Sequence, residues 1–163
     1  MPGKTNSKSS QLSSVTYCYD ECLPPKIGEI LKHVGFPVVM AQTGIKDEQL
    51  IPDMGTNGHT WITKDDRAKT QHEALVGTAN ISVIWVRGLA HQRKKKGPIS
   101  RVVSMKDILR MLVNKLDQVS AVIEAAKGKP RYFLLYTSAA RGDDKLEPYT
   151  SLREIHDRLS GAR

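Results

Sequence analysis

The stretch SVTYCYDECLPPKIGEIL, residues 14–31, joins a β-prone run to a helix start and places two carboxylates between them. The residues VTYCY are β-branched or aromatic, which is typical of a short strand. The pair Pro24 and Pro25 sets the φ angle that the first turn of a helix needs. Asp20 and Glu21 therefore lie where a strand ends and a helix is about to begin.

A helix is predicted after the two prolines. Its apolar residues recur at i, i+3, i+4 and i+7 and so share one face, and Gly35 supplies a C-terminal stop. The residues of this apolar stripe are Ile27, Ile30, Leu31 and Val34. The run PVVMA follows as a second strand, so this part of the chain predicts a βαβ unit with parallel strands.

The alternation of strand and helix patterns continues along the chain. Further strands are expected at HTWIT, ISVIWV and YFLLYT, and helices at 46–58, 67–77, 105–126 and 151–161, the first of them interrupted by Pro52. The helix 105–126 is expected to cover one face of the sheet, because one of its sides stays apolar. That side consists of Ile108, Met111, Leu112, Leu116, Val119 and Val122. The pattern predicts an α/β fold with a mainly parallel sheet.

One compact domain is expected for a chain of 163 residues with 39% hydrophobic composition. Residues 1–13 are polar and are predicted to form a disordered tail. The domain is predicted to span 14–140, with a core at 15–100 and the covering helix at 105–126. Residues 141–163 are predicted to form a charged C-terminal tail or helix.

Composition narrows the classes of function. A net charge of +8 and a pI near 9.6 favour a polyanionic partner, of which nucleic acid is the first choice. The sequence has no run of about eighteen apolar residues and no apolar signal segment, so a cytoplasmic protein without membrane association is expected. Cys18 and Cys22 lack zinc-ribbon and CxxC spacing and are expected to be reduced thiols. P-loop, GxSxG and HExxH motifs are absent from the sequence.

Three aspartates are expected at one edge of the sheet. Asp20 and Asp65 each follow a strand, and Asp47 lies where a helix begins. The carboxyl ends of parallel strands meet at one edge, so these acids can become neighbours although they are distant in sequence. A cluster of carboxylates is usually neutralised by a divalent cation, and Mg²⁺ or Mn²⁺ prefers such oxygen ligands. That chemistry suits phosphodiester hydrolysis.

Read singly, an aspartate after a strand is more often a turn former or a helix N-cap than a ligand. The neighbouring acids are likewise expected first to be solvated or to cap a helix, and only second to bind a metal ion. These secondary candidates are Glu21, Glu48, Asp53, Asp66 and Glu73.

The ordered set YCYDECLPPKIGEIL and GIKDEQLIPDMGTNGHTWITKDDR resembles the PIN-like domains, compact relatives of the PIN nucleases. In those domains an Asp ends the first strand before a Leu-Pro helix start, a second Asp opens a middle helix, and a third follows a strand like WITKD. The resemblance covers about residues 15–86 and implies a three-layer α/β/α PIN-like domain, here with a C-terminal helical extension. On the matched positions it implies catalysis and metal ligation by Asp20, Asp47 and Asp65, with Glu48 and Asp66 as adjacent candidates.

The chain departs from the fuller PIN pattern in one respect. PIN nucleases usually carry a further acid on a helix between the first strand and the middle aspartate. The interval between Asp20 and Asp47 is too short for that helical hairpin, so this ligand is missing or replaced, and Glu21 could substitute for it.

The densest positive cluster follows the strand ISVIWV. A phosphate-binding patch beside the acidic edge and a solvated loop are both open readings, since Lys and Arg supply most sequence-independent affinity for nucleic acid. The residues concerned are Arg87, His91, Arg93, Lys94, Lys95 and Lys96.

The resemblance implies a Mg²⁺- or Mn²⁺-dependent endoribonuclease that hydrolyses RNA. Many such small proteins are toxins of type II toxin–antitoxin pairs, which implies a protein antitoxin as partner; a homodimer is also open. The alternative is a catalytically silent PIN-like module that binds nucleic acid or protein. The missing fourth acid is the feature that separates the two.

Overall fold

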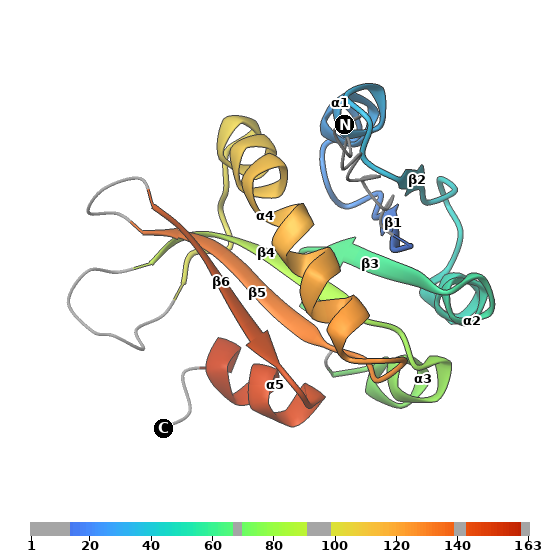
Figure 1. Cartoon of the computed structure of the whole chain (residues 1–163). Helices are drawn as coiled ribbons and strands as arrows, with labels where there is room; N and C mark the ends of the chain where they lie inside the picture. The colour runs from blue at the N-terminus through green and yellow to red at the C-terminus, as the bar shows by residue number, and fades with distance from the viewer. Residues whose placement is uncertain (1–13, 67–69, 91–98, 139–142, 161–163) are drawn as a thin grey trace, which may run out of the picture.

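The computed structural model describes residues 14–66, 70–90, 99–138 and 143–160. Within these ranges the chain forms a six-stranded sheet in the order β2-β1-β3-β4-β5-β6, with helices on both of its faces (Figure 1). The strands are β1 (Thr16–Tyr19), β2 (Val38–Met40), β3 (His59–Thr63), β4 (Val83–Ala90), β5 (Tyr132–Ser138) and β6 (Asp144–Tyr149). The helices are α1 (Pro25–His33), α2 (Asp47–Asn57), α3 (Glu73–Ala79), α4 (Met105–Ala125) and α5 (Leu152–Ser160).

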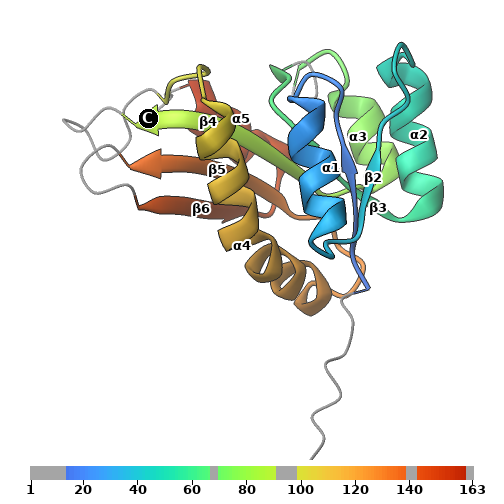
Figure 2. The same cartoon turned by 90° about the horizontal axis from the view of Figure 1, so that it is seen from above.

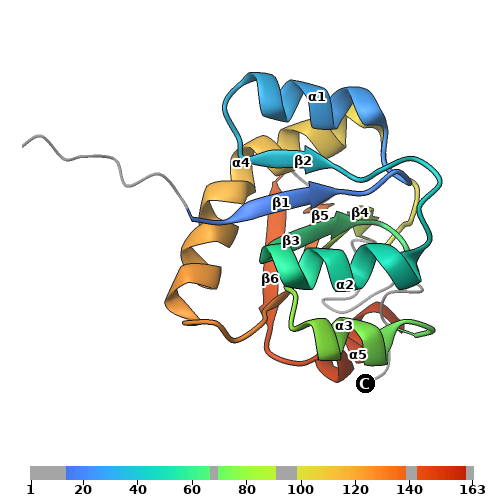
Figure 3. The ribbon, with the colours of Figure 1, turned by 90° about the vertical axis from the view of Figure 1, so that its right-hand side faces the viewer.

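The sheet is parallel from β2 to β5, and only β6 runs antiparallel to its neighbour. Helices α1 and α4 cover one face, and α2, α3 and α5 cover the other (Figures 2 and 3). The predicted α/β class with a mainly parallel sheet is confirmed. The expected covering role of the long helix is also confirmed, because the inward residues of α4 are buried against the sheet.

Strand β1 shows how the sequence divides its side chains between the two cores. Tyr17 and Tyr19 point into the core under α1 and α4, whereas Cys18 points into the core under α2, α3 and α5. Tyr17 Oη donates to Leu116 O at 2.9 Å and shares a short hydrogen bond with Ser120, which links β1 to α4. Successive strand residues face opposite sides of the sheet, so Asp20, which follows Tyr19, lies on the side of α2 and α3.

Helix α1 buries only part of its predicted apolar stripe. Ile27 and Leu31 are buried, but Ile30 and Val34 are 42% and 59% exposed. The helix lies over the edge of the sheet, where its partner β2 is three residues long. The sheet is too narrow there to cover the whole stripe.

The predicted interruption of one helix and the predicted bounds of another are wrong. Helix α2 is continuous through Pro52, because buried residues on either side of it, Ile51 and Met54, pack on the sheet and offset a cost of about 3 kcal/mol for an interior proline. Helix α3 begins at Glu73 and ends at Ala79, later than the predicted 67–77. Its end is set by Asn80, which adopts the left-handed conformation with φ 56°.

The end of β4 and the C-terminal segment also differ from expectation. Arg87 to Ala90, predicted to open the basic loop, continue β4, since residues 99–100 pair with this stretch and extend it. Strand β6 has the charged sequence DKLEPY and was absent from the predicted elements, but it pairs with β5 along its length. The predicted final helix is present as α5, with Leu152 and Ile155 buried in the core. In the described ranges, none of the helices combines the length and apolar character that crossing a bilayer requires.

Candidate functional site

The strand order places a topological switch point between β1 and β3. The connection from β1 leads through α1 to β2 on one side, and the chain then returns through α2, on the opposite face, to β3 on the other side. In open α/β sheets, ligands bind outside the carboxyl ends of the strands at such a point. The expected site is therefore lined by the residues that follow the last residue of β1, Tyr19, and the last residue of β3, Thr63.

Asp20 is a buried acid at this point, and hydrogen bonds hold its side chain. It is 5% exposed, and its amide donates to Ile62 O at 3.0 Å, which continues the parallel pairing of β1 with β3. Its Oδ2 accepts hydrogen bonds from Thr63 Oγ1 at 2.5 Å and from Cys22 Sγ at 3.2 Å. Within the described part of the chain these bonds all involve Oδ2, which leaves Oδ1 for a ligand.

Thr63 connects Asp20 with Asp65. The Thr63 hydroxyl accepts a hydrogen bond from the Asp65 amide at 3.0 Å while it donates to Asp20. The Asp65 carbonyl in turn accepts from Trp85 Nε1 at 3.1 Å. Two of the three predicted catalytic aspartates are thus joined through one buried threonine.

Asp66 lies between two arginines. Its Oδ1 pairs with Arg87 Nη2 and its Oδ2 with Arg101 Nη2. Arg87 is 2% exposed and also donates to the carbonyls of Lys64 at 3.1 Å and Val86 at 3.0 Å. Burial lowers the pKa of Arg87, while the charge of Asp66 acts in the opposite direction. A carboxylate that pairs with two guanidinium groups is poorly suited to a metal ion.

Asp47 belongs to a second, neighbouring pair. It is the first residue of α2, and its Oδ2 lies 3.4 Å from His72 Nε2, with both side chains largely buried. A carboxylate at a helix N-terminus is stabilised by the helix dipole. This position agrees with the expected helix start, and the Asp47 carboxylate lies against His72.

The remaining candidates are placed as follows. Glu21 is exposed, and its Oε2 accepts a hydrogen bond from the amide of Gly44 at 2.9 Å, a residue with φ +81°. Glu48, Asp53 and Glu73 are exposed on helices α2 and α3. The basic residues His91, Arg93, Lys94, Lys95 and Lys96 lie outside the described residues.

The donor set at the switch point fits a hard divalent cation with few protein ligands. Mg²⁺ keeps several waters when one or two carboxylates hold it, so Asp20 and Asp65 offer suitable oxygen ligands. Among the residues that the structure describes, no three acidic, histidine or cysteine side chains come close enough together to hold one ion. Two carboxylates at this edge are fewer than the four protein ligands of a closed structural site.

Residues that the sequence pattern does not single out complete this edge. Thr63, His72, Arg101 and Cys22 all contact a predicted site residue. Burial, and then the charge of Asp20, raise the pKa of Cys22 to about 11, so its thiol keeps the proton that it donates to Asp20. Thr63 could have been found from strand alternation, because it is the inward residue beside Asp20 on the adjacent strand.

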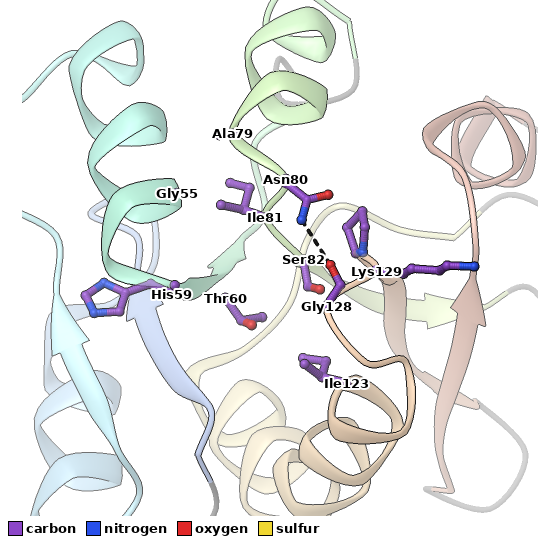
Figure 4. Close-up of a pocket in the computed structure, with 12 residues that line it drawn as sticks. Gly55, His59, Thr60, Ala79, Asn80, Ile81, Ser82, Ile123, Gly128 and Lys129 are labelled. Atoms are coloured by element: carbon purple, nitrogen blue, oxygen red, sulfur yellow. Dashed lines mark hydrogen bonds between the residues drawn. The ribbon is translucent and has the colours of Figure 1, made fainter.

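A cavity of about 370 Å³ lies at the opposite, amino edge of the sheet, where α2, α3 and α4 end (Figure 4). Across it, Asn80 Nδ2 donates to Gly128 O at 3.0 Å. The described residues that line it include none of the predicted site residues. This cavity is therefore separate from the acidic candidate site at the carboxyl edge.

No protein-family model matches the chain, and no curated protein or solved structure is significantly similar to it.

Proposed function

We propose that the protein is a PIN-like, Mg²⁺- or Mn²⁺-dependent endoribonuclease. The observation that supports this most is the buried Asp20 carboxylate, which is held by Thr63 beside Asp65 at the switch point between β1 and β3. The basic composition supports a nucleic-acid substrate. The resemblance to PIN-like domains adds the reaction class and the cytoplasmic setting of a type II toxin with a protein antitoxin.

In this proposal Asp20 and Asp65 hold the ion, and Asp47 contributes negative charge from the start of α2. The bound ion would supply Lewis-acid polarisation of a phosphoryl oxygen and a water of lowered pKa. The protein's own contribution is orientation. Thr63 holds Oδ2 of the Asp20 carboxylate, and Trp85 holds the backbone carbonyl of Asp65.

The second candidate is a silent PIN-like module that binds nucleic acid or protein without cleavage. It is favoured by the absence, among the described residues, of three side chains that could hold one ion together. The missing fourth acid between Asp20 and Asp47 points the same way.

Metal-dependent cleavage of RNA by charge-neutral variants tests the proposal. Asp20→Asn and Asp65→Asn should each abolish cleavage in Mg²⁺ or Mn²⁺, because an amide binds these ions poorly. The amide oxygen that the first variant introduces at position 20 can still accept a hydrogen bond from Thr63. Asp117→Asn is the matched control, since Asp117 is exposed on α4, is not a candidate of the site and loses the same charge.

Full activity in either purified site variant would contradict the proposed ligands. Wild-type protein that binds RNA but does not cleave it with either metal would identify the silent module instead. Circular dichroism of each variant shows whether the fold is retained.

A further inference from the structure

Arg101 is fixed at the carboxyl edge by the segment that carries it. Gly88 N donates to Ser100 O at 2.7 Å, and Ser100 N donates to Leu89 O at 3.0 Å. A Cβ atom at position 88 would overlap Val102 O, so this segment runs directly against the backbone of β4. Arg101 therefore stands at the end of the strand next to β3, beside the acids that follow β3.

The charges around Asp66 leave one arginine available. Asp66 pairs with both Arg87 and Arg101, so two guanidinium groups share one carboxylate. Arg87 is buried and needs Asp66 as its counter-ion, because an unpaired buried charge is costly. The Arg101 side chain is 77% exposed, and an exposed pair of this kind contributes little to stability. Arg101 can therefore leave Asp66 for another anion at small cost.

An RNA strand that approaches this edge meets the negative charges of Asp20 and Asp65. A cation next to them is needed to hold a phosphate nearby. We propose that Arg101 binds a backbone phosphate of single-stranded RNA and positions the strand beside Asp20 and Asp65. This role rests on the ribonuclease function proposed above. A guanidinium can bond two phosphate oxygens at once, and such a contact positions the strand without reading its sequence.

Binding of RNA at several salt concentrations tests this role. The probe is a fluorescently labelled oligouridylate of about twelve nucleotides, mixed with the full-length protein in EDTA so that no metal-dependent hydrolysis occurs. Each phosphate contact to a single strand contributes a slope of roughly −0.7 in log affinity against log salt. Arg101→Gln should flatten the slope by about 0.7 and weaken binding roughly fivefold at 0.1 M salt relative to 1 M. Arg101→Lys keeps the charge and should keep the wild-type slope.

Arg131→Gln is the matched control. Arg131 directly precedes β5 at the amino edge, and its guanidinium donates to the neighbouring Pro130 O at 3.0 Å. This variant loses the same charge and should keep the wild-type slope. A wild-type slope in Arg101→Gln, or an equal change in Arg131→Gln, overturns the role of Arg101 and leaves the ribonuclease proposal intact. If the wild-type protein binds no RNA at any salt concentration, both proposals are wrong.

Discussion

Replacing Thr63 by valine should destabilise the protein through the Asp20 carboxylate. Thr63 is fully buried, and its hydroxyl donates to Asp20 at 2.5 Å and accepts the Asp65 amide at 3.0 Å. Valine is close to threonine in shape, so the change removes these hydrogen bonds without opening a cavity. A hydrogen bond to a charged group contributes about 1.5–3 kcal/mol and a neutral one about 1 kcal/mol. The free energy of unfolding should therefore fall by about 3 kcal/mol.

Urea unfolding at neutral pH without added metal measures this loss. Thr63→Ser is the control, because it keeps the hydroxyl and loses one methyl group, which contributes about 1 kcal/mol. The slope of unfolding free energy against urea should not change. A double-mutant cycle that combines Thr63→Val with Asp20→Ala should give a coupling of about 1.5–3 kcal/mol.

A Thr63→Val protein as stable as the Thr63→Ser protein would refute this reasoning. A coupling energy below about 0.5 kcal/mol would do the same, since sites that do not interact add within that margin. In either case the hydroxyl does not hold Asp20, and the role proposed for this carboxylate in metal binding loses its support.

Three further predictions concern the rest of the molecule. Burial raises the pKa of Tyr17 to about 12, so the unfolded chain loses this proton at a lower pH than the folded protein. The free energy of unfolding therefore falls as the pH rises above the ordinary pKa of 10.0. Urea unfolding at about pH 9 and pH 11 should show that Tyr17→Phe removes about 1.4 kcal/mol of this fall. Burial also raises the pKa of Cys18 and of Cys22 to about 11, which lowers the fraction of each thiol that is present as the reactive thiolate. Alkylation by iodoacetamide should therefore be about 100-fold slower in the native than in the unfolded protein, as followed by mass spectrometry. Arg110→Ala should lower the unfolding free energy by about 3 kcal/mol, because the largely buried Asp144 of β6 loses the guanidinium at 2.9 Å and keeps the longer hydrogen bond from Asn114 at 3.3 Å. Thermal melting measures this loss, with Arg110→Lys as the control that keeps the charge. Wild-type melting of both variants would contradict the prediction.

The fold could be predicted from the sequence at segments whose local residue pattern matches their burial in the structure. The runs at VTYCY, HTWIT and ISVIWV are β-branched or aromatic in most positions and are buried on both faces, because helices cover both sides of the sheet, and each contains or begins a strand. Strand β6 was not predictable in this way, because an edge strand with charged residues and Pro148 gives no apolar run. The continuity of α2 depends on packing around Pro52, which no local preference reveals.

For the candidate site, the sequence predicted the edge of the sheet at which the acids lie but not the partners of their side chains. Strand ends followed by acids correctly placed Asp20 and Asp65 at one edge, since parallel strands share their carboxyl side. Sequence spacing could not indicate that Asp66 pairs with arginines, because Arg87 and Arg101 come from β4 and the segment after it. The partner of Asp47 was equally hidden, since His72 reaches it from the turn before α3.

The strand order also constrains how this chain can assemble during synthesis. After β1 forms, β2 adds to one side and β3 to the other, and β4, β5 and β6 then join the same growing edge in the order in which they are made. No strand of the described sheet has to insert between two strands that are already paired. Long-range parallel pairing is slow and exposes apolar surface to aggregation, but here each newly made strand finds an open edge of the sheet already formed. The sheet can therefore grow vectorially as the chain leaves the ribosome, with the Asp20–Thr63 contact made as soon as β3 docks.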